Sequence, residues 1–444
     1  MVARGRFGRP PGGRSVRRPA VLALTLILAL TLSLGGCWDR RELEDVAFVL
    51  AIGIDKGEHA PRRYTLQIAV PALIAQGRGG GGGGPGVITE VIEGRTLTEA
   101  ANLLATMRHK RISFEHEKII IFGKELAQDG ILVFVGELVR DRQFRRTNYL
   151  LVSTGTAGDI LQGLQTERDP AGAIAELVRL ASNTGLAPAT TVHEWLIAYE
   201  TVGGEPVAPI IGPPRDVAES GLEMGQSGGG AAGGEGGTGH ASGGGAVTPP
   251  KLQVMGTAVF YGDRLVDFLS GEQTQVYLLM VGKMSRSVFT FQMQDPEAVV
   301  SIAVRGEQPK MKAAMEGDMP SISERIVFEG DITKFLYRGQ FLTKESDLKK
   351  VTEQLDHRLK GIADDLVARM QGLGTDIFGF GHSFRYRAKS FDEWIRTNWP
   401  AQFVRAKVNL EVRSFVRRTG TTLSPLEELP IYRHPEGGGG SSGP

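Results

Sequence analysis

The order of apolar and polar residues predicts alternating strands and helices in the first half of the chain. Val46 to Ile54 is an almost continuous apolar run, typical of a strand buried on both faces. Tyr64 to Val70 alternates apolar and polar positions, which indicates a neighbouring strand. Thr96 and Glu99 have the spacing of a helix capping box, and the apolar stripe behind them predicts a helix to about His109. By the same reasoning we expect strands at 119–122 and 149–152, a helix at 131–139, and helix starts at 156 and 191.

The second half shows the same mixture. Gly262-Asp263 separates two apolar runs and predicts a turn between paired strands. The clearest helix is expected to be capped by Ser346, to carry one apolar stripe, and to end at Gly372 and Gly374. The other expected elements are strands at 254–261, 265–269, 288–291, 299–304, 322–328 and 404–412, and a helix from about 270 to 281. The fold class we expect is therefore α+β, with several domains, each a mixed or antiparallel sheet with helices packed against it.

Glycine-rich stretches divide the chain. Such compositions bury too little apolar area to offset the entropy of ordering, so we expect them to be flexible. The predicted organisation is an N-terminal domain at 38–215 with a glycine-rich loop at 77–86, a linker at 216–250, a C-terminal region at 251–425, and a disordered tail at 426–444. A division of the C-terminal region into two subdomains near residue 285 stays open.

The first 36 residues have the order of a signal peptide. Six arginines and no acidic residue precede an apolar and Thr/Ser run from Ala20 to Leu34, and small residues follow at Gly35 and Gly36. The run is shorter than the roughly 20 residues that span a membrane. A cleaved leader therefore fits better than a spanning helix.

Cys37 is the only cysteine and directly follows this leader. An exported chain with one cysteine forms no internal disulfide, so this residue requires another role. Leu34-Gly35-Gly36-Cys37 resembles the lipobox of bacterial lipoproteins, in which the cysteine becomes the lipidated first residue. We expect Cys37 to carry the lipid and to anchor the chain. An uncleaved anchor helix and an ordinary secretory leader are the alternatives.

Charge argues against nucleic-acid binding. The full chain has a formal net charge of +1, and removal of the six leader arginines leaves −5. A mildly acidic body lacks the electrostatic footprint that nucleic-acid binding requires.

The sequence contains no motif that identifies a catalytic residue, a metal site or a cofactor site. The G-x-S-x-G pattern at 225–229 lies inside the glycine-rich linker, not on a turn between a strand and a helix. His109, Glu115, His116 and Glu117 lack the H-E-x-x-H spacing of a zinc site. Asp364 and Asp365 fall on the polar face of the long helix, where a carboxylate pair is usually solvated.

Several separate motifs resemble the Ger(x)C family, the lipoprotein C subunits of spore germinant receptors. The first block is Cys37-Trp38-Asp39-Arg40-Arg41-Glu42-Leu43, followed by Ala51-Ile52-Gly53-Ile54-Asp55-Lys56 and by Ser113-Phe114-Glu115-His116. The last blocks are Thr375-Asp376-Ile377-Phe378-Gly379-Phe380-Gly381, then Trp394, Asn398-Trp399 and Phe403, and Arg417 to Gly420. The glycine-rich insertion, the long linker and the arginine-rich leader depart from the family pattern.

The resemblance implies a non-enzymatic receptor subunit, anchored by lipid on the outer surface of the spore inner membrane. It implies two integral-membrane partners, the A and B type subunits, and a role in assembly and signalling that triggers germination. Trp38, Asp39, Arg40, Arg41, Glu42, Gly53, Asp55, Asp376, Phe378, Gly379 and Gly381 are signature residues and candidates for partner contacts. For Asp376 to Gly381, a tight glycine turn that carries the phenylalanines into the core is the alternative interpretation. The alternative function is an exported lipoprotein enzyme or a solute-binding lipoprotein of unrecognised type.

Overall fold

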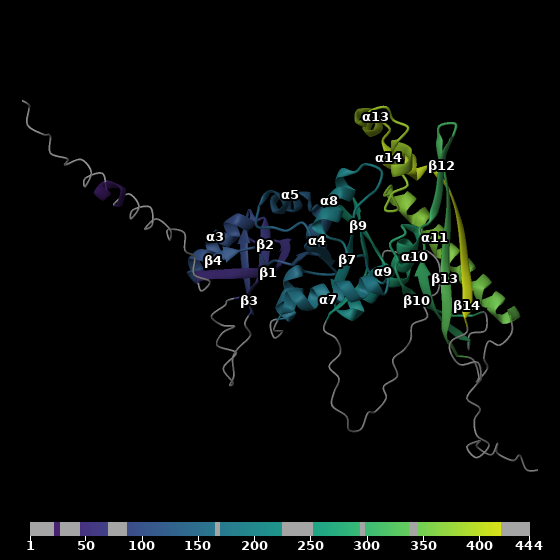
Figure 1. Ribbon diagram of the computed structural model, residues 1–444, viewed down its shortest axis with the longest axis horizontal. Helices are drawn as coiled ribbons and strands as arrows, with labels where there is room; N and C mark the ends of the chain where they lie inside the picture. The colour runs from purple at the N-terminus through teal and green to yellow at the C-terminus, as the bar shows by residue number, and fades with distance from the viewer. Residues whose placement is uncertain are drawn as a thin grey trace, which may run out of the picture.

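The computed structural model describes residues 22–26, 45–69, 87–164, 169–223, 252–293, 298–336 and 345–418. Within these ranges the chain forms two sheets that lie one after the other along the longest axis (Figure 1). No helix in these ranges has the length and apolar character needed to span a bilayer. The expected α+β, multi-domain fold is confirmed.

The first sheet, which we call sheet A, is mixed. Its order is β3-β2-β1-β5-β6-β7-β8-β9, and β4 pairs with β1. Strands β1, β5, β6 and β7 run parallel in the centre, whereas β2, β3, β8 and β9 pair antiparallel at the two sides. The strands of sheet A are β1 (Val46–Lys56), β2 (Arg62–Ala69), β3 (Val87–Gly94), β4 (Arg111–Ser113), β5 (Ile119–Phe122), β6 (Tyr149–Ser153), β7 (Val207–Gly212), β8 (Gln253–Tyr261) and β9 (Arg264–Leu269).

Helices cover both faces of sheet A, which explains why its central strands are apolar throughout. One face packs against α3 (Leu97–Arg108), α4 (Lys124–Asp129), α5 (Leu132–Arg140) and α8 (Val192–Glu200). The other face packs against α6 (Ala157–Gly163) and α7 (Pro170–Asn183). Helix α9 (Pro214–Glu223) follows β7.

The second sheet, sheet B, is built around the long strand β13 (Met319–Leu336). Strands β10 (Ser287–Gln292), β11 (Val299–Gly306) and β12 (Lys310–Glu316) pair antiparallel, and β14 (Lys407–Arg418) runs parallel to β13. Helix α11 (Glu345–Leu373) packs along β14 and buries its apolar stripe in the core. Three short helices, α12 (His382–Arg385), α13 (Phe391–Arg396) and α14 (Trp399–Val404), connect α11 to β14.

The core of sheet B continues into sheet A. Helix α10 (Gly271–Met280) contributes to the same cluster as Val259 and Leu269 of sheet A and the apolar stripe of α11. Arg369 on α11 forms an ion pair at 2.5 Å with buried Asp267 on β9, and Arg358 pairs with Glu272 on α10. The two sheets are therefore joined by shared packing and by ion pairs.

The division between the sheets does not coincide with the predicted linker at 216–250. Strands β8 and β9 follow that linker in sequence, yet they extend sheet A next to β7. The chain passes from one sheet to the other between β9 and β10, close to residue 285, where the sequence left a subdomain boundary open.

One predicted strand boundary is wrong. The alternating pattern placed the start of the last strand at Val404, but residues 399–404 form α14 and β14 begins at Lys407. Pro400 fits the first turn of a helix, and the helix places Phe403 in the core, while Val404 is exposed. The predicted turn at Gly262-Asp263 is confirmed, as are the helix starts at Thr156 and Thr191 and the helix from about residue 270.

Candidate functional site at the junction of the two sheets

The signature residues fall into three groups. Cys37 and Trp38, Asp39, Arg40, Arg41 and Glu42 lie outside the described residues. Gly53 and Asp55 lie on β1, in the middle of sheet A. Asp376, Phe378, Gly379 and Gly381 lie just after α11, at the junction of the two sheets. The structure thus does not bring the second and third groups together into one site.

Asp55 fixes helix α6 to the end of β1. Its carboxylate accepts hydrogen bonds from the backbone N–H groups of Ala157 at 2.7 Å and Gly158 at 2.8 Å. These N–H groups belong to the first turn of α6 and have no hydrogen-bond acceptor within the helix. Burial raises the pKa of Asp55, and the two backbone donors oppose that shift. Gly53 allows the same helix to approach, because a Cβ there would lie 3.1 Å from the Cβ of Ala157.

Asp376 organises a tight turn. Its carboxylate accepts hydrogen bonds from the N–H groups of Gly379 and Gly381, both at 2.9 Å, and from the indole Nε1 of Trp399 at 2.8 Å. Gly379 has a φ of +74°, a conformation that glycine adopts at little cost. The turn directs Phe380 into the core, where it packs near Phe403. The alternative interpretation of this motif, a structural glycine turn, thus matches the geometry.

A loop between α8 and β7 docks on this turn. The backbone N–H of Glu205 donates to the Asp376 carbonyl at 2.8 Å. The indole of Trp394 donates to the carbonyl of Val202 at 2.9 Å. Thr375, which is fully buried, donates its hydroxyl to the carbonyl of Phe260 on β8 at 2.7 Å. Three hydrogen bonds therefore link residues 375–394 to sheet A.

Two glycines make this contact close. A Cβ at Gly381 would lie 2.5 Å from the Cα of Gly203 and 2.5 Å from the Trp399 indole nitrogen. Such distances exclude any side chain at that position without a backbone shift. Gly381 could be identified from its family motif, but the 202–205 loop could not be identified from the sequence. That loop lies more than 170 residues away in sequence and carries no periodic pattern.

Three carboxyl groups near the junction have raised pKa values, in each case chiefly because burial disfavours the charged form. The pKa of Asp376 is raised to about 6, that of Glu205 to about 7, and that of Glu324 to about 8. The charge of Asp376 adds to the shift at both other groups. One oxygen of Glu205 accepts a hydrogen bond from the Gly262 N–H at 2.8 Å, whereas Glu324 Oε2 is buried without a partner.

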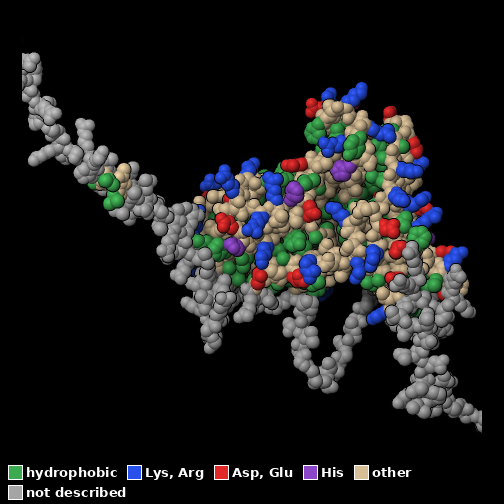
Figure 2. Space-filling model, viewed as in Figure 1, with side chains coloured by type: hydrophobic (Ala, Val, Ile, Leu, Met, Phe, Trp, Pro, Cys, Tyr) green, Lys and Arg blue, Asp and Glu red, His purple; other side chains and the backbone are tan. Residues whose placement is uncertain are grey.

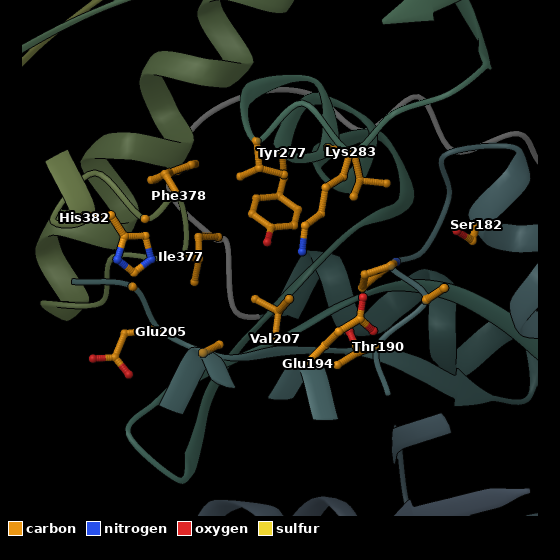
Figure 3. Close-up of a pocket in the computed structure, with 17 residues that line it drawn as sticks. Ser182, Thr190, Glu194, Glu205, Val207, Tyr277, Lys283, Ile377, Phe378 and His382 are labelled. Carbon is orange, nitrogen blue, oxygen red and sulfur yellow. The ribbon is translucent and has the colours of Figure 1, made fainter. Parts of the chain in front are cut away.

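A cleft of about 530 Å³ opens beside this junction. Its walls come from α7, α8 and β7 on the sheet A side, and from α10 and residues 377–382 on the other. Figure 3 shows the hydroxyl of Tyr277 and the amine of Lys283 pointing into the cleft toward Val207. His382 borders one end of the cleft, and Glu194 and Thr190 line the wall opposite Lys283.

The residues examined in the sequence for catalytic or metal-binding patterns do not form one site in the structure. The His116 ring packs edge-on against Phe48, and the Glu117 carboxylate accepts a hydrogen bond from Asn148. Asp364 pairs with Lys360 on the exposed face of α11. The motif at 225–229 lies outside the described residues. In the ranges that the structure describes, no group of three or more His, Cys, Asp or Glu side chains could hold a metal ion.

The chain matches two domains of one protein family. A spore germination protein N-terminal domain matches residues 39–213, and a spore germination B3/GerAC-like C-terminal domain matches residues 255–420. The chain belongs to the GerAC-like spore germination proteins. This finding confirms the family that the sequence motifs indicated, and it assigns the chain a role in spore germination.

Relatives from Bacillus subtilis (strain 168) cover both domains. The putative spore germination protein YfkR is 27% identical over 365 residues, with 81% of this chain and 85% of the relative covered. The spore germination protein KC is 25% identical over 422 residues, with 92% and 98% covered. The crystal structure of the GerBC protein matches with a TM-score of 0.50 and 15% identity, over 85% of this chain and 99% of that chain. The last match shows a shared fold.

Proposed function

We propose that this spore germination protein is the lipid-anchored C subunit of a nutrient germinant receptor. In this proposal it acts in receptor assembly and signalling, without catalysis, together with the integral-membrane A and B type subunits. Lipid on Cys37 holds it on the outer surface of the spore inner membrane.

One observation carries the proposal. The match to the family's N-terminal domain begins at residue 39, two residues after Cys37. A lipid on Cys37 therefore leaves almost no spacer between the membrane anchor and the family domain. Such a tether keeps the folded body close to the membrane, where integral-membrane partners are within reach.

The anchor is tested by the N-terminal peptide of the chain isolated from spore membranes. The proposal predicts a peptide that begins at Cys37 and carries the mass of attached acyl chains. In a Cys37→Ala variant the acyl mass is absent and germination is impaired, whereas a Ser33→Ala variant in the leader matches the wild type. A wild-type peptide that begins upstream of residue 37, or that carries no acyl mass, contradicts the anchor.

Solute binding is a second candidate function, and the cleft between the sheets is the observation that favours it. The cleft carries a lysine and a tyrosine that point inward, and its volume suits a small polar molecule. Calorimetric titration of the purified chain with amino acids and sugars tests this function. A saturable signal that a Lys283→Ala variant loses would establish solute binding at the cleft; an absence of heat at all concentrations would exclude it for these compounds.

A further inference from the structure

Four arginines surround a hollow on the face of sheet A that packs against α3 and α5. Figure 2 shows Lys and Arg side chains gathered along the upper edge of the molecule, over α3 and α5. The hollow measures about 710 Å³ and lies between the start of α3 and the end of α5. We call it the basic hollow. Its arginines are Arg62, Arg95, Arg140 and Arg142.

These arginines outnumber the carboxylates around them. In the ranges that the structure describes, none of the four forms an ion pair, and three of them are exposed. The hollow also holds two carboxylates, Glu137 and Asp141, so its formal net charge is +2. Glu137 accepts a hydrogen bond from the Leu97 N–H at 3.0 Å, and Asp141 accepts one from the Gln143 N–H at 2.9 Å. The chain without its leader arginines has a formal net charge of −5, but the surface around the hollow is positive.

The hollow is also preorganised. The Arg62 guanidinium lies over the Phe134 ring, 4.5 Å from its centroid, and donates to the carbonyl of Arg95. Gln143 accepts the Phe114 N–H through its side-chain oxygen, which leaves its amide N–H groups as donors. Arginine binds phosphate oxygens through two parallel N–H groups, so these donors suit a phosphate ligand.

One wall of the hollow is linked by contacts to the start of β1, the first described residues after the proposed anchor, whereas Arg62 on the other wall pairs with Lys56 at the far end of β1. Only seven residues separate Cys37 from Asp45, and eight steps of extended chain span at most about 28 Å. At the start of β1, Val46 pairs with Arg111 of β4. Strand β4 leads directly to Phe114, whose N–H donates to Gln143 in the wall of the hollow. The start of β1 is thus connected to the Gln143 wall of the basic hollow through β4 and Phe114.

We propose that the basic hollow binds the phosphate groups of anionic phospholipids in the membrane that carries the anchor. This proposal rests on the lipid anchor proposed above. A bilayer presents many phosphate groups at one surface, and the short tether keeps the hollow near that surface. Each arginine–phosphate contact therefore adds to the membrane affinity that the lipid anchor provides. The contact orients sheet A relative to the bilayer. Sheet B and the cleft then extend away from the anchored end along the long axis of the molecule (Figure 1).

The test uses the full chain, extracted from membranes and reconstituted into vesicles of phosphatidylcholine with or without phosphatidylglycerol. Val133 lines the hollow and is 62% exposed, so Val133→Cys offers a thiol for an environment-sensitive fluorophore. The charge reversal Arg140→Glu/Arg142→Glu is compared with Arg286→Glu/Arg305→Glu, which changes charge equally at two exposed arginines outside sheet A. Thermal unfolding checks that both pairs fold like the parent.

We expect the fluorophore emission to shift to the blue in vesicles that contain phosphatidylglycerol. High salt and the Arg140/Arg142 reversal abolish the shift, because screening and charge reversal remove the attraction. The Arg286/Arg305 reversal keeps it. No lipid-dependent shift, an equal loss in both reversals, or an equal response to inorganic phosphate with neutral vesicles would overturn the proposal. The mass of the N-terminal peptide, read on the same sample, separates failure of the anchor from failure of the hollow.

Discussion

The indole N–H of Trp399 donates to the carboxylate of Asp376 at 2.8 Å, and both residues are almost fully buried. The same carboxylate also receives two backbone N–H groups of its own turn. The carbonyl of Asp376 accepts the N–H of Glu205, which belongs to the loop that leads into β7 of sheet A. Asp376 therefore connects its own turn to α14 through Trp399, and to the loop that leads into sheet A through Glu205.

An Asp376→Asn variant should be strongly destabilised. The substituted amide keeps one oxygen acceptor but places an NH₂ group opposite N–H donors, so at least one buried donor loses its partner. Loss of hydrogen bonds to a buried charge predicts a decrease in the free energy of unfolding of about 2–4 kcal/mol. Urea unfolding measures the effect. Asp392→Asn on exposed α13 is the control and should cost a few tenths of that; equal losses in the two variants would contradict the role of Asp376.

Gly381→Ala should disrupt the junction because its Cβ would lie 2.5 Å from the Cα of Gly203. We expect a lower melting temperature and a greater rate of proteolysis between the sheets. Gly372→Ala is the matched control, since a Cβ there meets nothing within 4 Å and the residue lies in α11. That change should stabilise the helix by about 0.5–1 kcal/mol. Similar melting temperatures for both variants would refute the close-approach argument.

Asp55→Ala should weaken the attachment of α6 to β1. It removes the acceptor for two N–H groups at 2.7 and 2.8 Å and should lower the free energy of unfolding by about 2 kcal/mol, near the upper end for a helix cap. Asp55→Asn keeps one acceptor and should lose less. Asp159→Ala, on the exposed first turn of the same helix, tests whether negative charge alone is responsible. A loss as large as that of Asp55→Ala would favour charge over the hydrogen bonds.

Glu324 makes stability depend on pH. Burial raises its pKa from 4.5 to about 8, so between these values the folded state holds a proton that the unfolded state has released. Stability from this group is therefore present below pH 4.5 and falls as the pH rises toward 8. Glu324→Gln cannot ionise, and it should be more stable than the wild type at pH 8 and similar at pH 5. Urea unfolding at both values checks this, and a variant that is less stable at pH 8 would show that the ionised carboxylate is favourable.

An element could be predicted from the sequence where its pattern of residues spans only neighbouring positions. The capping box at Thr191, the turn at Gly262 and the apolar stripe of α11 all depend on residues within a few turns of each other, and all three are present. The strand β12 was missed because it lies on an exposed edge. Its residues Lys310 to Glu316 are mostly solvent-exposed, so no apolar alternation marks them.

Pairing between distant segments could not be predicted. The apolar runs of β1, β5 and β6 indicated burial, but their parallel order depends on the connection through α3 between β1 and β5 and on the crossover through α4 and α5 between β5 and β6. The glycine-rich linker lies between β7 and β8 in the sequence, and the pairing of these two strands could not be predicted from it. At the candidate site, the family motif identified Asp376 and Gly381, but Gly203 and Val202 carry no signal of their own. Their role follows only from backbone contacts in the folded chain.

The central claim is that this chain works as a receptor subunit, and affinity purification from detergent-solubilised spore membranes tests it most directly. A tag at the C-terminus allows the wild type to be compared with Cys37→Ala. The account predicts that two integral-membrane proteins copurify with the wild type in a constant ratio, and that Cys37→Ala recovers less of both. Recovery of the wild-type chain alone, from membranes in which it is intact, would contradict the account.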